Sequence, residues 1–211
     1  MSEAVAARVV QDEPGPGLLA KIRYIRRHRM WTPRYWAYGL RYLWRFKILS
    51  RHIRTGGMVF LARGAKVYCR RGLGRMEIGR SVWIGEGCAL RCHEGSFRLG
   101  DRVVMGGHNT IHGYLDIEVG EDCIFAEWIY VADFDHRFKD IETPIQKQGL
   151  TYSPVRIGRD CWIGNKVSVL RGASVGEGSV LGAHAVVRGD IPAYSVAVGA
   201  PARMVKRRGD T

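Results

Sequence analysis

The 211-residue sequence predicts a mainly β protein, a parallel β-helix of about five coils preceded by a basic helical segment. Three observations predict this fold. Aliphatic residues return at every sixth position, the breaks in that period fall at one place in each coil, and the excess positive charge lies ahead of the repeat. A repeat of this kind is typical of solenoid architectures.

The six-residue period is clearest towards the C-terminus. Aliphatic residues occupy six successive positions of it, and glycine follows four of them: Ile157, Ile163, Val169, Val175, Leu181 and Val187. Strands have a period of 2 and α-helices one of 3.6. A strict period of six instead indicates a coil in which each hexapeptide is one short strand plus a corner.

The same period extends upstream in groups of three, each making one triangular coil. These groups are Ile78, Ile84 and Leu90; Leu99, Met105 and Ile111; and Val119, Phe125 and Val131. A less regular coil is expected before them, around Leu61 and Val67. The steps between successive groups are 9, 8 and 26 residues, so every insertion falls at the same corner of the triangle.

The fourth residue after each aliphatic position should also point inward, where three walls converge and space is short. Most of these residues are small or β-branched: Val82, Cys88, Val103, Asn109, Cys123, Ile129, Cys161, Val167, Ala173, Ser179 and Ala185. Three of the five cysteines are among them, and the chain has no CxxC pair. We interpret the cysteines as buried apolar side chains.

The sequence shows no signal peptide and no apolar run of the roughly 18 residues that span a bilayer. A reducing, cytoplasmic location is therefore expected, and the protein could also associate with the inner face of the membrane.

The net charge of +13 is unevenly distributed along the chain: residues 14–76 contain 16 Lys or Arg and no Asp or Glu. We divide the chain into a disordered leader (1–16), a basic aromatic helical arm (17–56), the β-helix (57–198, with a loop at 132–156) and a tail (199–211).

The arm interleaves basic and aromatic side chains. Pro33 after Thr32 is typical of a helix start, and we expect two helices, at about 18–30 and 33–53. Such a composition suits the interface of an anionic membrane and is also found in nucleic-acid-binding proteins. The structural alternative is that the aromatics pack on the β-helix or on a neighbouring subunit. We favour packing or membrane contact over nucleic acid.

Chemistry is expected in the insertion at 132–156, because a corner needs only a residue or two and loops this long usually carry function. The insertion contains one histidine, His136, and four carboxylates, Asp133, Asp135, Asp140 and Glu142.

The repeat, this loop and the tail together resemble the hexapeptide-repeat O-acyltransferases. The loop has the form DH-x-F-x-D-x-x-x-P-I-x-x-Q-G, and the later segments are PVRIGRDCWIG (154–164) and DIPAYSVAVGAPARMVK (190–206). The chain most resembles the maltose and galactoside acetyltransferases and related capsule and exopolysaccharide O-acetyltransferases, over about residues 78–207. The resemblance implies a left-handed β-helix and a homotrimer. It also implies acetyl-coenzyme A as donor and a sugar, polysaccharide or glycolipid hydroxyl as acceptor.

The resemblance makes His136 the expected general base. In the family this histidine lies five residues past the last hexapeptide position before the long loop, and Val131 plus five gives His136. Imidazole titrates near neutral pH and can take the hydroxyl proton as the oxygen attacks the thioester. Asp135 or Asp133 would orient the ring, and both alternatives stay open. The plain alternative is an ordinary exposed loop histidine.

Matches to the family also imply a donor site. Trp162 would line it, with core packing as its alternative, and Asn165 and Ala183 would contact the pantetheine arm. Arg203 and Lys206 would neutralise the phosphates of coenzyme A.

The chain departs from the family at two places. Arg188 and Gly189 stand where the family often has Thr-Lys, so Arg188 would replace the lysine at the donor. Gly106 stands where the family has an acceptor-binding asparagine. His108, Asn109 and Gln148 are therefore the acceptor-binding candidates.

Two other classes of function are alternatives for this sequence. One is a non-catalytic trimeric scaffold that uses the basic arm to bind a membrane or a partner. The other is a zinc enzyme like the β-helical carbonic anhydrases, which bind the metal through three histidines, two of them five residues apart. His108 and His112 are four apart and lack a suitable third partner, so we expect no metal.

Overall fold

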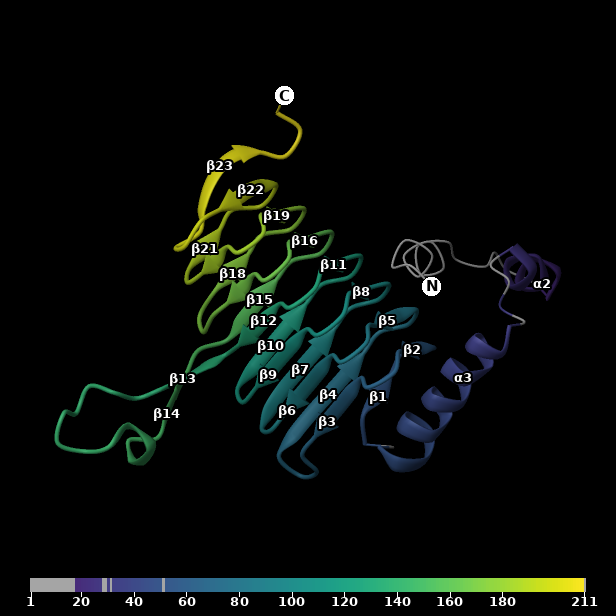
Figure 1. The fold of residues 1–211 in the computed structure, drawn as a ribbon, viewed down its shortest axis with the longest axis horizontal. Coiled ribbons are helices and arrows are strands. Elements are labelled where there is room, and N and C mark those ends of the chain that lie inside the picture. The colour runs from purple at the N-terminus through teal and green to yellow at the C-terminus, as the bar shows by residue number, and fades with distance from the viewer. Residues whose placement is uncertain (1–17, 28–29, 31, 51, 211) are drawn as a thin grey trace.

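The computed structural model describes residues 18–27, 30, 32–50 and 52–210. The repeat folds into a parallel β-helix with three faces, and the chain visits the faces in rotation (Figure 1). The predicted fold is confirmed. The expected leader lies outside the described residues.

Each face is one sheet. Face 1 comprises β1 (Arg54–Thr55), β4 (Gly74–Ile78), β7 (Gly95–Leu99), β10 (Asp116–Val119), β15 (Val155–Ile157), β18 (Ser174–Val175) and β21 (Asp190–Ile191). Face 2 comprises β2 (Val59–Leu61), β5 (Val82–Ile84), β8 (Val104–Met105), β11 (Ile124–Phe125), β16 (Trp162–Ile163), β19 (Val180–Leu181), β22 (Ser195–Val198) and β23 (Arg203–Arg207). Face 3 comprises β3 (Lys66–Cys69), β6 (Ala89–Cys92), β9 (Thr110–Gly113), β12 (Tyr130–Ala132), β17 (Ser168–Val169) and β20 (Val186–Val187).

The less regular first coil is complete. Thr55 pairs with Ile78, Leu61 with Ile84 and Val67 with Leu90, which is the register that the later coils keep. Six full coils therefore stand in the described part of the chain, one more than the five well-marked ones in the sequence. Among the described strands of the three faces, all neighbours are parallel except β23, which folds back and pairs antiparallel with β22.

The interior is filled as the six-residue period predicts. The eleven small inward positions named above are each 1% exposed or less. The glycines that follow the aliphatic positions have a matching role, since they lie where one coil stacks on the next. A Cβ on Gly158, for example, would lie 2.5 Å from the amide nitrogen of Glu177. These corners stay glycine because backbone from the next coil occupies the space of a side chain.

The insertions fall at the corner between face 3 and the next strand of face 1, here called corner 3–1. The long one follows β12 and contains β13 (Phe134–His136), η2 (Ile145–Lys147) and β14 (Leu150–Tyr152). Figure 1 shows it projecting away from the β-helix. The other two corners, 1–2 and 2–3, keep a constant register from coil to coil.

The N-terminal arm is helical, in α2 (Leu18–Arg27) and in α3 (Pro33–Tyr42), which continues as the π-helix η1 (Leu43–Leu49). Both segments end a few residues before the boundaries expected from the sequence. Tyr35 and Tyr38 of α3 are buried against Phe60, Trp83 and Val104 of face 2. Part of the aromatic content of the arm thus packs on the β-helix. None of the described helices is long and apolar enough to cross a membrane.

Candidate active site

The insertion is a two-stranded ribbon with a structured tip. In the antiparallel pair β13–β14, Phe134 lies opposite Tyr152, Asp135 opposite Thr151 and His136 opposite Leu150. Because side chains alternate along a strand, Phe134 and His136 share one side of the ribbon and Asp135 lies on the other.

Asp133 anchors the foot of the ribbon. Its carboxylate is fully buried and accepts three backbone N–H bonds of 2.8 Å each, from Tyr114, Leu115 and Asp116. These amides belong to corner 3–1 of the preceding coil. The expectation that Asp133 orients His136 is therefore corrected, because its acceptor sites are used to join two coils.

Asp135, the other candidate for orienting His136, is bound to a different group. Its carboxylate accepts a bond of 2.9 Å from Nε of Arg171. Another guanidinium nitrogen of Arg171, Nη1, donates to Oγ of Ser153 at 3.2 Å. Arg171 lies at corner 3–1 of the next coil. The Asp135–Arg171 pair ties the ribbon to the coil above it, as Asp133 ties it to the coil below.

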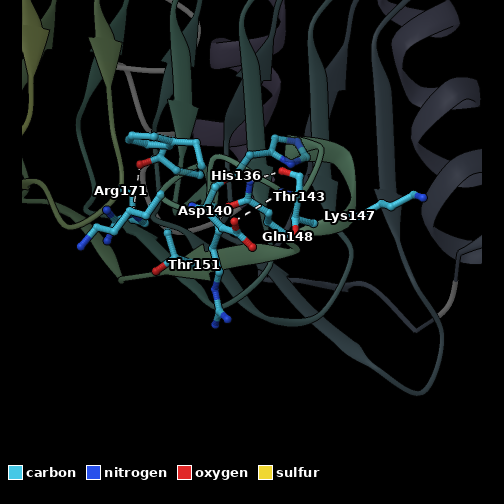
Figure 2. Close-up of a pocket in the computed structure, with 11 residues that line it drawn as sticks. His136, Asp140, Thr143, Lys147, Gln148, Thr151 and Arg171 are labelled. Atoms are coloured by element: carbon cyan, nitrogen blue, oxygen red, sulfur yellow. Dashed lines mark hydrogen bonds and ion pairs between the residues drawn. The ribbon is translucent and has the colours of Figure 1, made fainter.

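His136 lies at the end of β13, exposed, beside a pocket of about 830 Å³ within the loop (Figure 2). The pocket is lined by Asp135, His136, Arg137, Phe138, Lys139, Asp140, Thr143, Lys147, Gln148, Thr151 and Arg171. Within the described residues, no hydrogen bond or ion pair engages the imidazole of His136. The ring is therefore free to bind a hydroxyl group.

The tip of the loop is closed by Asp140 and Gln148. The side-chain amide of Gln148 donates to the carbonyl oxygens of Asp140 and Thr143, at 2.7 Å each, and accepts from the Asp140 N–H. Asp140 accepts from the N–H of Glu142 at 2.9 Å. Bonds from Thr143 and Glu142 lower the pKa of the Asp140 carboxyl. Gln148 thus closes the tip of the loop and also lines the pocket, so its acceptor role stays a prediction.

An aromatic cluster adjoins the side of the ribbon that carries His136. The ring of Tyr114 lies 4.7 Å from Phe134 and 6.2 Å from Tyr152, measured between centroids. The ring of His93 stacks on that of Tyr114, with the centroids 4.7 Å apart. Tyr152 is 43% exposed, so the cluster presents aromatic surface to solvent beside the candidate base.

His93 and His112 form a pair, with their Nε2 atoms 2.8 Å apart. One nitrogen must donate and the other accept, so the pair cannot be doubly protonated and keep this contact. Burial, followed by the charges of His93 and Arg91, lowers the pKa of His112 to about 4. The described residues contain no cluster of three or more His, Cys, Asp or Glu side chains placed to hold a metal ion.

Two acceptor candidates lie away from His136 in this chain. His108 is at corner 2–3, at the far end of the face 3 strands, and stacks on Trp128 at 4.3 Å. Asn109 is fully buried. Its amide donates to the carbonyls of Gly106 and Ala126 and accepts from the Ile129 N–H. The acceptor role of Asn109 is therefore corrected, because the residue joins two coils from inside.

The expected donor residues gather on face 2 and corner 2–3. Trp162 is on the outer surface of face 2, 55% exposed, in line with Val180 and Val196. Val196 in turn pairs with Lys206 on β23. The core-packing alternative for Trp162 does not fit this exposure.

The remaining donor candidates divide between two corners. Asn165 and Ala183 are exposed at corner 2–3 of successive coils, and Arg203 pairs with Val198 at the same end of β22. Arg188 instead follows β20 at corner 3–1. The structure thus brings five of the six donor candidates to one edge of one chain and leaves Arg188 apart.

Comparisons with known proteins place the chain in a family. Residues 154–189 match the family model of the bacterial transferase hexapeptide (six repeats). The chain is 53% identical to a probable acetyltransferase of Mycobacterium tuberculosis, Rv3034c, over 90% of this chain and 63% of that protein. It is 31% identical to the putative lipopolysaccharide biosynthesis O-acetyl transferase WbbJ of Escherichia coli, over 64% of this chain and 72% of WbbJ.

The chain belongs to the hexapeptide-repeat transferase family. This hexapeptide transferase spans somewhat less than two thirds of the length of its M. tuberculosis relative. Its fold is also that of a variant of AntD, an N-acyltransferase from Bacillus cereus solved with dTDP and coenzyme A. That match has a TM-score of 0.65 and 20% identity, over 78% of this chain and 89% of that one.

Several residues at the site of this hexapeptide transferase were not found from the sequence, namely Arg171, Tyr114, Phe134 and Tyr152. A signal existed for their place in the coil. Tyr114 and Arg171 follow the last strand of a coil, and Phe134 and Tyr152 lie within the insertion, so all four share corner 3–1 with His136. The direction of each side chain could not be read from that signal.

Proposed function

We propose that this hexapeptide transferase moves an acetyl group from acetyl-coenzyme A to a hydroxyl of a sugar, polysaccharide or glycolipid, with His136 as general base. The observation that carries the proposal is the position of His136. It stands at the end of β13, at the family register, exposed beside the loop pocket, and its imidazole makes no hydrogen bond among the described residues. It is held there by the anchors Asp133 and Arg171.

The reaction needs one base and one site for negative charge. An imidazole nitrogen of His136 takes the hydroxyl proton while the hydroxyl oxygen forms a bond to the thioester carbonyl carbon. The resulting oxyanion is stabilised by an N–H donor. Collapse breaks the carbon–sulfur bond, and the proton passes from the imidazolium to the departing thiolate. No covalent enzyme intermediate is required.

The aromatic cluster supports a sugar as the acceptor. Tyr114, Phe134 and Tyr152 present ring surface on the side of the ribbon that carries His136. Carbohydrate rings have apolar C–H faces that pack on such surfaces, and the carboxylates and amides of the pocket can bind hydroxyls. The name of WbbJ, which refers to lipopolysaccharide biosynthesis, agrees with a glycan acceptor.

Replacing Tyr152 with alanine is expected to raise the KM for the glycan acceptor about fivefold to tenfold, the loss of one aromatic contact. The KM for acetyl-coenzyme A and the kcat should change little, because the ring is not a reacting group. Steady-state kinetics with each substrate varied in turn measure this. Tyr194→Ala, an exposed tyrosine of a distant coil, is the matched control. Equal effects of the two substitutions would contradict the assignment.

The donor is assigned to the edge formed by face 2 and corner 2–3. Trp162 offers an exposed aromatic surface, and Arg203 and Lys206 lie on the neighbouring β23, both exposed. Basic side chains of this kind bind phosphate groups, so the adenosine diphosphate end of coenzyme A fits near β23.

The double substitution Arg203→Ala and Lys206→Ala is expected to raise the KM for acetyl-coenzyme A by about tenfold or more, since two charged contacts to phosphate are lost. The kcat at saturating donor should be unchanged, because the phosphates lie far from the thioester. Arg75→Ala, an exposed arginine on face 1, serves as control. A changed kcat with an unchanged KM would show that the donor lies elsewhere.

The homotrimer and the membrane contact of residues 17–56 are also proposed, at the cytoplasmic side. The tip of the ribbon supports assembly, because Phe138, Ile141 and Ile145 are each more than half exposed there. A neighbouring copy would cover them and bring its own donor edge to His136. In that arrangement Arg188 could reach the donor from a second chain, and Arg188→Ala would then raise the KM for acetyl-coenzyme A.

The direct test is release of free thiol from acetyl-coenzyme A in the presence of a panel of glycans and glycolipids, with mass spectrometry of the acceptors. Thiol release that depends on an acceptor, together with an acetylated product, supports the proposal. Absence of both across the panel, with the oligomer intact, would favour the non-catalytic scaffold.

A further inference from the structure

We infer that one side of the α3–η1 helix docks on an anionic membrane surface. The side is made by Trp36, Leu40, Leu43, Trp44 and Ile48, called here the tryptophan stripe. The inference rests on the membrane contact proposed above for residues 17–56 and assigns it to this surface. It does not depend on the proposed acyl transfer.

The tryptophan stripe is a continuous apolar surface open to solvent. Trp36, Leu40, Trp44 and Ile48 recur at intervals of four, and Leu43 follows Leu40 by three, so they lie on one side of the helix. Each of them is between 51% and 64% exposed. Single exposed apolar side chains are ordinary, but a contiguous group that includes two tryptophans marks a surface that contacts something other than water.

The opposite side of the same helix is fixed. Tyr35, Tyr38 and Phe46 are buried, and the ring of Tyr38 lies 5.1 Å from that of Trp83 on face 2. Arg41 adds a bond from its guanidinium to the Leu61 carbonyl at 3.2 Å. The helix cannot turn its stripe inward without losing these contacts, so the stripe stays outward. In Figure 1, α3 lies beside β2 at the N-terminal end of the β-helix.

The charge around the stripe selects the partner. Residues 14–76 contain 16 basic residues and no acidic ones. Lys47 is exposed on the same helix. Arg54 and Arg70 are exposed on the adjoining coil, where they are ion-paired with Glu77 and Glu94. Two such stripes packed on each other would bring like charges together. An anionic lipid surface instead attracts the basic groups, while tryptophan and leucine insert at the headgroup boundary.

The test is flotation of the full-length protein with vesicles of equal parts phosphatidylglycerol and phosphatidylcholine, and with vesicles of phosphatidylcholine alone. The protein should float with the anionic vesicles, and raised salt should weaken this binding because it screens the charges. In the double variant Trp36→Ser and Trp44→Ser, the affinity for the anionic vesicles should fall by about tenfold or more, since two inserted aromatic side chains are lost. Tryptophan fluorescence of the unsubstituted protein should shift to shorter wavelength on binding.

The matched control is Leu73→Ser, a half-exposed leucine of corner 3–1 outside the stripe, which should float like the unsubstituted protein. Light scattering is measured on every variant. Equal flotation of the double variant and the unsubstituted protein would overturn the inference. So would a change in oligomeric state without a change in flotation, because the stripe would then be an interface between copies of this chain.

Discussion

Replacement of His136 by alanine is expected to lower the kcat for acyl transfer by about a hundredfold or more, the usual contribution of a general base. The KM values should change much less, because the imidazole acts on the proton in the transition state and the substrates are held by other groups. The structure supports this separation. The imidazole of His136 is exposed and makes no hydrogen bond within the described part of the chain, so its removal should leave the fold intact.

Two controls sharpen this test. Arg137→Ala changes the next residue, which is also exposed and lines the same pocket, and it should retain most of the activity. Added imidazole should restore part of the activity of the His136→Ala protein, which a purely structural role of His136 would not allow. If His136→Ala kept full turnover with an unchanged oligomeric state, the proposed mechanism would be wrong.

Replacement of Asp133 by alanine is expected to reduce the free energy of unfolding by about 3 kcal/mol or more. Its buried carboxylate accepts three backbone N–H bonds, and a hydrogen bond to a charged group contributes about 1.5–3 kcal/mol. The alanine variant would leave the amides of Tyr114, Leu115 and Asp116 without their acceptor. Activity should fall as well, because these bonds hold the foot of the ribbon that carries His136.

Urea denaturation followed by circular dichroism measures the loss of stability. Asp133→Asn should lie between the alanine variant and the unsubstituted protein, since the amide keeps one acceptor oxygen but places a donor group against N–H donors. Asp135→Asn is the matched control. Its carboxylate is half-exposed and paired with Arg171, and exposed ion pairs contribute about 1 kcal/mol or less. An equal loss for both aspartates would contradict the anchoring role of Asp133.

Asp133 and Asn109 show why part of the site escaped prediction. The sequence places both residues correctly along the coil, and Asn109 even at an inward position. Apart from the Gly106 carbonyl, however, their bonding partners belong to other coils, 17 to 20 residues away in the chain. The six-residue period gives the strand and side of each residue. The period does not give the path of the backbone at a corner. That path decides whether a polar side chain bonds to a backbone amide or is left available to a substrate.

The arm shows the same limit. The spacing of Pro33 and the aromatics predicts a helix, and the structure confirms one over Pro33–Tyr42. Tyr35 and Trp36 are adjacent in sequence and similar in chemistry, yet Tyr35 is buried and Trp36 is 62% exposed. Only the position of Phe60 and Trp83 on face 2 decides which aromatic packs and which remains outside.

The sequence by itself determined the β-helix, its inward residues, the corner that receives insertions and the register of His136. These properties follow from a local period, because each hexapeptide must bury the same small set of side chains to close a coil. The tertiary structure alone decided that Asp133 and Arg171 anchor the ribbon, that aromatic rings adjoin the candidate base, and that the tryptophan stripe faces solvent. These depend on contacts between coils and on the direction in which irregular segments leave them, which no local period encodes.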